Sequence, residues 1–246
     1  MSNDEVTVHC MIRNELFWIE PVLLAALACT RNIIVMDTGS EDGTKDVIEK
    51  LWKPGVRIEY SDHILDAEEN GRARQILSDM TKTEWAFMLD GDELYEVSKL
   101  KYLLANPPPS NYKLGFTTLL NVDWKDGHFV ARNKHNSQKY FRPKENIWKG
   151  NYPFEVPDQY EDPKGYFYYQ LPPGEVHGVH LHCLKRSPLD DQMQMRMVQK
   201  EANSRCPITQ DPYDDFPWPP EYLFPDWHPY IPSSTLVSSI SGSPDY

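Results

Sequence analysis

The chain has 246 residues, of which 40% are hydrophobic and 12% aromatic, so it can bury a core and is not a disordered protein. A formal net charge of -12 argues against a broad surface for nucleic acid or anionic membranes, because such partners need clustered Lys and Arg. The cysteines, at positions 10, 29, 183 and 206, form no CxxC pair, so neither a zinc site nor a disulfide framework is expected.

The N-terminal residues 1–7 include acids where a secretion signal needs basic residues followed by an apolar run. No later window approaches the roughly 18 apolar residues of a membrane span. We therefore expect a soluble, unprocessed protein in the cytoplasm, with no transmembrane segment.

The first half of the chain alternates short apolar runs with segments of helical periodicity, which predicts a parallel sheet wrapped by helices. Strands are expected at 6–12, 33–36, 56–60 and 85–89. Helices are expected at 15–29, after the turn residues 37–44, and through 73–80. The predicted order is therefore βαβαβαβ.

The second half contains clustered strands without long helices between them, which predicts a mixed or antiparallel extension of the sheet. These strands are expected at 114–119, in a hairpin around Asp126-Gly127, and at 139–142, 166–171 and 176–182. A helix is predicted from Ser187-Pro188 to about residue 203, and eight prolines between 207 and 232 predict an extended tail over 204–246. We expect a single domain over residues 1–203.

Two carboxylates one residue apart, Asp90 and Asp92, end the apolar strand 85–89. Open α/β sheets bind ligands beyond the carboxyl ends of their strands, so both side chains are expected in that crevice. Carboxylate oxygens suit Mg²⁺ or Mn²⁺, and such an ion can neutralise a diphosphate leaving group. A solvated acidic loop is the alternative for an isolated motif of this kind.

Four motifs carry a resemblance to a known family. Residues 34–44, Ile-Val-Met-Asp-Thr-Gly-Ser-Glu-Asp-Gly-Thr, resemble the Asp-x-Gly-Ser-x-Asp-Gly-Thr signature of family 2 glycosyltransferases. Residues 11–15 resemble the opening strand-to-helix motif of that family, and residues 73–75 and 85–93 resemble its Ala-Arg-Asn and DxD elements in order and spacing. Gln75 stands where the family usually has Asn, which leaves the hydrogen bonding around Arg74 open.

The resemblance spans residues 6–97 and continues weakly to about 200. It is greatest to the bacterial subgroup that adds sugars to lipopolysaccharide cores, which has compact phage-encoded members. It implies a GT-A fold of the α/β class with a mixed central sheet, followed by the short extended tail. Its Rossmann-like nucleotide-binding half would be residues 1–97 and its acceptor half residues 98–203. For a phage-encoded protein the expected location is the host cytoplasm.

The resemblance also implies roles for residues of the first half. Asp37 would accept from uracil N3–H, although it could instead cap the turn before the next helix. Arg74 would reach the nucleotide phosphates or brace the DxD loop, unless it is a solvated helix residue. Asp90 would touch the ribose or a metal-bound water, and Asp92 would ligate the metal directly.

Residues 140–155 resemble the subgroup's "Phe-Arg … Trp-x-Gly … His-Glu" stretch, with Phe154 in place of the His. Glu155 is therefore the candidate general base, which an inverting transfer needs on the acceptor side; a surface Glu in a loop is the alternative. Trp148 could stack on a sugar face or pack within the protein.

Histidines alternate along 176–182, which places His180 and His182 on one face of a strand. In GT-A enzymes a late His commonly completes the metal shell, and His182 aligns best, with His180 in reserve. Lys185 and Arg186 would then hold the diphosphate. A structural role is the alternative for a strand histidine.

These motifs predict a metal-dependent inverting glycosyltransferase that uses Mn²⁺ or Mg²⁺ and a UDP-sugar donor, with UDP-glucose the first choice. A non-catalytic nucleotide-sugar-binding protein of the same fold is one alternative. A nucleotidyltransferase is another, disfavoured because residues 11–15 contain no glycine. The acceptor is left open among a lipopolysaccharide core, another glycan, a protein and modified DNA.

Overall fold

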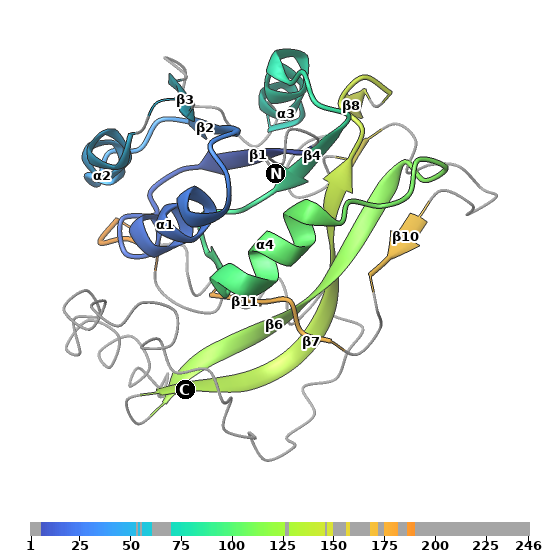
Figure 1. Cartoon of the computed structure of the whole chain (residues 1–246). Helices are drawn as coiled ribbons and strands as arrows, with labels where there is room; N and C mark the ends of the chain where they lie inside the picture. Colours follow the sequence, from blue (N-terminus) through green and yellow to red (C-terminus); the bar gives the residue numbers. More distant parts are fainter. Residues whose placement is uncertain are drawn as a thin grey trace.

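Four parallel strands form the first half of the central sheet, in the order β3-β2-β1-β4. They are β1 (Val6–Ile12), β2 (Ile33–Asp37), β3 (Val56–Tyr60) and β4 (Trp85–Met88). The helices between them are α1 (Ile19–Cys29), α2 (Thr44–Leu51) and α3 (Asn70–Met80). The predicted βαβαβαβ order is therefore confirmed (Figure 1).

The computed structural model describes residues 6–52, 54, 56–60, 70–125, 128–145, 147–149, 156–157, 168–171, 175–181 and 186–189. The predicted helix beyond Ser187 and the predicted tail at 204–246 lie outside these residues. The division into a nucleotide-binding half and an acceptor half stays a prediction. No helix within the described residues is long and apolar enough to cross a bilayer.

Helices cover both faces of this parallel half. Ile33 and Val35 of β2 belong to the core shared with α1 and α2, whereas Ile34 and Met36 pack against α3. A strand buried on both faces needs a continuous apolar run, which explains the composition of β2. Helix α4 (Val97–Ala105), which the sequence did not predict, adds to the α1 side of the core.

The second half extends the sheet with a long antiparallel hairpin of β6 (Leu114–Lys125) and β7 (His128–Phe141). Strand β7 pairs antiparallel with β4, which joins the two halves into one sheet. Further strands of the sheet are β10 (Tyr168–Gln170) and β11 (Gly178–His180), both parallel to β6, and β5 (Glu93–Leu94), antiparallel to β11. The predicted mixed extension is thus confirmed.

A separate two-stranded ladder joins β8 (Trp148–Lys149) to β9 (Val156–Pro157). Strand β5 follows β4 closely in the chain, yet it lies at the opposite end of the strand order, beyond β11. The sheet therefore curls, and its far edge returns to the loop that follows β4.

Helix α1 begins at Ile19 rather than at the predicted residue 15. The backbone N–H groups of Glu15 and Leu16 donate to side chains of the β2–α2 loop, so these residues are held in a turn. The Glu15 carbonyl then accepts from the N–H groups of Trp18 and Ile19, at 2.9 Å each. The helix starts only where the loop contacts end.

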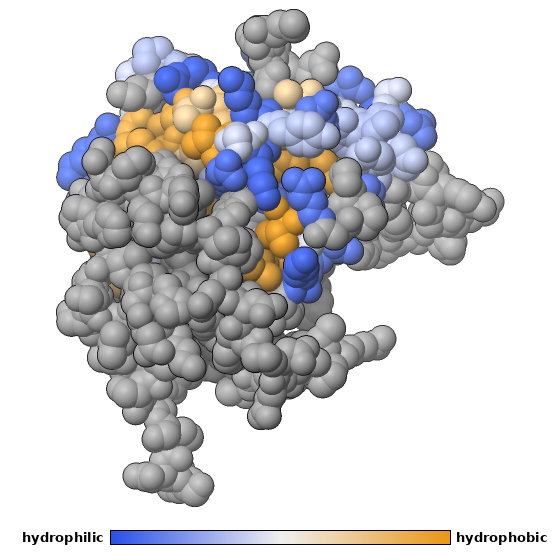
Figure 2. Space-filling model, turned by 60° about the horizontal axis from the view of Figure 1, so that its bottom comes forward, coloured by the Kyte–Doolittle hydropathy of each residue, from blue (hydrophilic) through white to orange (hydrophobic). Residues whose placement is uncertain are grey.

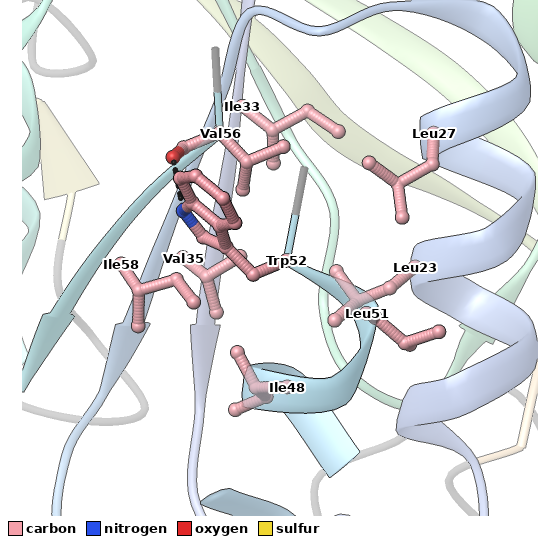
Figure 3. Close-up of a pocket in the computed structure, with 9 residues that line it drawn as sticks. All are labelled: Leu23, Leu27, Ile33, Val35, Ile48, Leu51, Trp52, Val56 and Ile58. Atoms are coloured by element: carbon pink, nitrogen blue, oxygen red, sulfur yellow. Dashed lines mark hydrogen bonds between the residues drawn. The ribbon is translucent and has the colours of Figure 1, made fainter. Parts of the chain in front are cut away.

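A small apolar hollow lies between α1, α2 and the sheet (Figure 3). Its lining residues are Leu23, Leu27, Ile33, Val35, Ile48, Leu51, Trp52, Val56 and Ile58. Trp52 is half exposed beside it, and its Nε1–H donates to the Val56 carbonyl at 3.2 Å. Because the lining side chains carry no charge, this hollow is unsuited to a phosphate and belongs to the packing of the helices on the sheet.

The large apolar side chains exposed in the described part of the chain are scattered over different elements. They are Leu24, Trp52, Ile76, Tyr102, Ile147 and Leu189. In Figure 2, apolar surface of the described residues appears in separate areas with hydrophilic side chains between them.

Candidate donor site

The carboxyl ends of β1, β2 and β4 meet at one edge of the sheet. Ile12 is in register with Asp37, and His9 is in register with Met88. The loops that follow the three strands therefore leave the sheet side by side, at the place where open α/β sheets bind ligands.

The loops after β1 and β2 are joined to each other. Asn14 has a positive φ of 54°, a conformation that Asn tolerates better than most residues. The hydrogen bonds between the loops run from Asn14 N–H to Ser40 Oγ (2.9 Å), Glu41 N–H to Asn14 Oδ1 (2.9 Å), Glu15 N–H to Thr44 Oγ1 (3.0 Å) and Leu16 N–H to Asp42 Oδ2 (3.2 Å). The polar residues of the 37–44 motif thus fix the shape of the first loop.

Asp37 is fully buried at the end of β2. Its Oδ1 accepts from the backbone N–H groups of Gly39 (2.8 Å) and Ser40 (2.7 Å), which is a turn-capping arrangement. Its Oδ2 is buried and accepts no hydrogen bond from the described residues. One oxygen therefore shapes the turn, and the other is a buried acceptor that the turn does not use.

The Asp90-Gly91-Asp92 loop presents its two carboxylates differently. The Asp90 side chain is 37% exposed, whereas Asp92 is buried. A Cβ added at Gly91 would lie 2.7 Å from Cγ of Glu15, so only glycine fits between the two acids. Glu15 is itself buried, and a third carboxylate thus lies against this loop.

Arg74 of α3 reaches the same loop. Its Nη2 lies 3.6 Å from Asp90 Oδ1, and its Nη1 donates to Met88 Sδ at 3.4 Å. The guanidinium carbon lies 5.5 Å from the centre of the Trp148 ring. These neighbours place the arginine beside the loop and largely out of solvent.

Gln75 and Trp148 connect α3 to β8. The Trp148 N–H donates to Gln75 Oε1 at 3.0 Å, and its Nε1–H donates to Ser78 Oγ at 3.1 Å. Its ring also packs edge-on against Phe141. Trp148 therefore packs within the protein. The Gln75 side chain is one methylene longer than that of Asn, and this length brings its Oε1 to the Trp148 N–H.

The pairing of β5 with β11 brings His180 to the Asp-Gly-Asp loop. His180 is in register with Glu93, and the Leu181 N–H donates to the Asp92 carbonyl at 2.8 Å. His180 Nε2 consequently lies 3.5 Å from Asp92 Oδ1. The His135 ring, on β7, lies against His180 with the centroids 5.4 Å apart.

Arg186 approaches the loop from the opposite side of Asp92. Its Nη1 lies 2.6 Å from Glu15 Oε1 and 3.5 Å from Asp92 Oδ2. Its carbonyl accepts from the Phe17 N–H at 3.1 Å, which fixes the backbone at this point. The other predicted residues of this half, His182, Lys185 and Glu155, lie outside the described residues.

Lys139 of β7 is a member of the site that the sequence did not predict. Its side chain is 1% exposed, and its Nζ lies 2.5 Å from Glu93 Oε1 and 3.3 Å from Asp90 Oδ2. Burial by itself would lower the pKa of Lys139, but Asp90 and Glu93 together raise it above its usual value. The lysine is therefore a buried ammonium ion.

The pKa values of the two acids beside Lys139 are shifted in opposite directions. Burial raises the pKa of Glu93 to about 7, against the opposing effect of Lys139. Burial also acts to raise the pKa of Asp90, but Lys139 and Arg74 outweigh it and hold that pKa below its usual value. Asp90 is thus ionised at neutral pH.

The acids and cations around the Asp-Gly-Asp loop suit an anionic ligand that binds together with a metal cation. Among the described residues no group of three His, Cys, Asp or Glu side chains is placed to hold a metal ion. Asp92 and His180 do supply one oxygen and one nitrogen that face each other, and these are donors that Mn²⁺ accepts. Two protein ligands fit a metal whose other positions are filled by phosphate oxygens and water.

The comparisons with known proteins agree with this fold. The family model described as glycosyl transferase family 2 matches residues 8–159. No curated protein sequence matches the chain. Among solved structures, TarS 1–349 of S. aureus has a TM-score of 0.52 at 12% identity, covering 82% of this chain and 72% of that one.

The same TarS fragment in complex with UDP-GlcNAc has a TM-score of 0.51 at 13% identity, over 71% of this chain and 58% of that one. Glucosyl-3-phosphoglycerate synthase of Mycobacterium tuberculosis, in complex with Mn²⁺, UDP and phosphoglyceric acid, has a TM-score of 0.39 at 18% identity. That likeness covers 46% of this chain and 43% of that one, which is too partial to bear on function. At these identities the TarS structures show a shared fold.

Proposed function

This chain belongs to glycosyl transferase family 2, and we propose that it transfers a hexose from a UDP-sugar to an acceptor hydroxyl with the help of a divalent cation. The observation that carries the proposal is the position of Asp92, whose two oxygens each lie 3.5 Å from a different partner, His180 and Arg186. An acid, a histidine and an arginine that converge at the strand ends suit a metal-bound diphosphate.

The uridine is proposed to lie over the end of β2. Asp37 Oδ2 is the buried acceptor left over by the turn, and uracil N3–H is a donor that suits it. Asp90 is proposed to face the ribose or a water of the metal, with Arg74 beside it. The complex of TarS 1–349 with UDP-GlcNAc is compatible with a uridine nucleotide as the donor.

The metal is proposed to bind between Asp92 and His180, with His182 as a further candidate ligand. When bound, Mn²⁺ or Mg²⁺ would neutralise charge on the diphosphate as the glycosidic bond breaks. Arg186 is already charged and lies against Asp92, so its guanidinium can turn toward a phosphate oxygen without crossing the site. Lys185 is proposed to assist it.

Transfer is proposed to invert the configuration at the anomeric carbon of the sugar. Glu155 is proposed to act as general base on the acceptor side. The carboxylate would accept the proton of the acceptor hydroxyl while the diphosphate leaves from the opposite face of the sugar. UDP-glucose is the proposed donor, by analogy with the subgroup that the motifs resemble, and the acceptor stays open among a lipopolysaccharide core, another glycan, a protein and modified DNA.

Thermal unfolding with a panel of nucleotide sugars tests the donor class. A ligand that binds only the folded state raises the melting temperature by mass action. UDP-sugars with Mn²⁺ should raise it by several degrees, whereas GDP- and dTDP-sugars should have little effect. Equal shifts with all three nucleotides, or with none, would overturn the proposed donor site.

Hydrolysis of UDP-glucose to UDP and glucose tests the chemistry without a known acceptor, because water can replace the acceptor hydroxyl. Glu155→Gln preserves the shape of the side chain but cannot accept a proton, so turnover should fall about 10²- to 10⁴-fold while UDP affinity is retained. A wild-type protein that binds UDP-glucose yet neither hydrolyses nor transfers it would be a binding protein, contrary to the proposal.

A further inference from the structure

A buried lysine in a β-strand needs a specific reason, because removing an ammonium ion from water costs several kcal/mol unless it is well paired. Lys139 is among the most deeply buried side chains of the described chain. Its partners Asp90 and Glu93 both lie in or next to the Asp-Gly-Asp loop. The lysine is thus built into the donor site rather than into the hydrophobic core.

A β-bulge directs Lys139 into the site. Gly115 of β6 pairs with Tyr140, but the next residue, Phe116, pairs with Gln138, so Lys139 is the extra residue of β7. Bulges bend a strand and re-aim a side chain, and they are frequent beside functional sites. This one follows the last pair between β4 and β7, Phe87 with Tyr140, where β4 ends and the loop begins.

Lys139 lies between two acids, the buried Glu93 and the more exposed Asp90. Glu93 is buried in β5, and its Oε2 lies 3.5 Å from the Tyr95 hydroxyl and 3.4 Å from the Asp90 N–H. Its Oε1 accepts from Lys139, which also donates to Asp90 Oδ2. Since Arg74 lies near Asp90 Oδ1, each oxygen of the half-exposed Asp90 has its own cation.

From this geometry we infer that Lys139 is a positioning residue of the donor site, which holds the Asp90 carboxylate in place for the nucleotide while Glu93 anchors the lysine. The inference rests on the proposed function and goes beyond it, since it assigns the orientation of the Asp-Gly-Asp loop to a residue from the other half of the sheet. Without the ammonium ion, the buried Glu93 would have to be neutral, and Arg74 would be the remaining cation beside Asp90.

A purely structural role for Lys139, neutralising Glu93 and nothing else, makes a different prediction. In that case, a double variant in which Lys139 and Glu93 are both replaced with neutral residues of similar shape should bind UDP as tightly as the wild-type protein. If the lysine positions Asp90, the same double replacement restores stability but leaves Asp90 without one of its cations. The variants are Lys139→Met and Lys139→Met/Glu93→Gln, and Lys113→Met is the matched control at a partly exposed lysine paired with Glu145.

The affinity for UDP in the presence of Mn²⁺, measured by calorimetric titration, and Tm are the readouts. Lys139→Met should lower Tm by about 10 °C and weaken UDP binding by about 10- to 100-fold. The double variant should recover most of Tm while its UDP binding stays at least about 10-fold weak. Lys113→Met should match the wild-type protein in both. A double variant that binds UDP as tightly as wild type would overturn the inference.

Crystal structures of the nucleotide-free variants provide a readout that does not depend on the donor. In the double variant the Asp90 carboxylate should change its orientation, since Arg74 beside Oδ1 then acts without Lys139 beside Oδ2, and an unmoved Asp90 would overturn the positioning role. If wild-type protein binds no UDP, the proposed function fails, and the position of Asp90 in these structures still decides the role of Lys139.

Discussion

Asp92 is the residue whose replacement tests the metal most directly, because its two oxygens face different partners, His180 and Arg186. Asp92→Asn keeps the size of the side chain but removes the charge that a divalent cation needs. The part of the UDP affinity that depends on Mn²⁺ should therefore fall by about 10- to 100-fold in calorimetric titrations with and without EDTA. Asp46→Asn, on the exposed face of α2, is the matched control and should leave it unchanged.

Single residues also show where sequence reasoning about the site stops. Asp90, Asp92, His180 and Arg186 could be chosen as candidates because motif spacing and strand alternation are properties of local sequence, and the structure brings these four together. Lys139 could not be chosen as a candidate from the sequence, because a lysine in a strand usually faces solvent. Its burial depends on a bulge and on pairing with strands far away in the chain, and no local pattern signals either.

The Asp-Gly-Asp loop gives a prediction at the level of an element, since its backbone lies directly against the β1–α1 loop. Gly91→Ala would place its Cβ 2.7 Å from Glu15 Cγ and 3.0 Å from Ile12 Cγ2. Glu15 is buried and tied to Arg186, so the loops must separate, at a cost of about 1–3 kcal/mol. Chemical denaturation should show this loss, and UDP affinity should fall with it.

A second substitution separates the effect of Gly91→Ala on stability from its effect on UDP affinity. Glu15→Ala in the Gly91→Ala background removes the clashing Cγ, so part of the lost stability should return. UDP affinity should stay low because Arg186 loses the carboxylate that holds it. Wild-type stability in the single Gly91→Ala variant would contradict the close packing of the two loops.

Elements of the two halves differ in how far the sequence predicted them. Strands β1, β2 and β4 follow from their apolar runs, because burial on both faces leaves a clear local pattern, whereas the edge strand β3 alternates apolar and charged residues. Most of β7 was not predicted, since its segment 133–138 is polar and becomes a strand through pairing with β6, a tertiary effect that outweighs propensity. Helix α4 was overlooked, although the spacing of Leu100, Leu103 and Leu104 is that of a buried helix face.

The stability of the whole molecule should depend on pH through His9, which lies in the middle of the sheet. Its Nε2 is hydrogen-bonded to Thr81 Oγ1, and burial, with smaller effects of Arg74 and Arg57, lowers its pKa from 6.5 to about 3. Between these pH values the unfolded chain binds one more proton than the folded chain. The stability contributed by neutral His9 is therefore complete above about pH 6.5 and is lost as pH falls toward 3.

Urea unfolding at several pH values measures this dependence. By pH 5 the free energy of unfolding should have dropped by about 2 kcal/mol on account of His9. In His9→Gln, which can still hydrogen-bond to Thr81, this component should be missing, so its stability should change less between pH 7 and pH 5. Identical pH slopes for the two proteins would show that the pKa of His9 is the same in the folded and unfolded chains, contrary to the prediction.

The arrangement of the strands has a consequence for biosynthesis. During translation β4 emerges well before β7, the strand that pairs with its outer side through Ala86 and Phe141. Until then one edge of an apolar, parallel sheet has open hydrogen-bonding groups, which are a template for pairing with other chains. A fragment that ends after β4 should therefore aggregate when it is expressed without the β6–β7 hairpin.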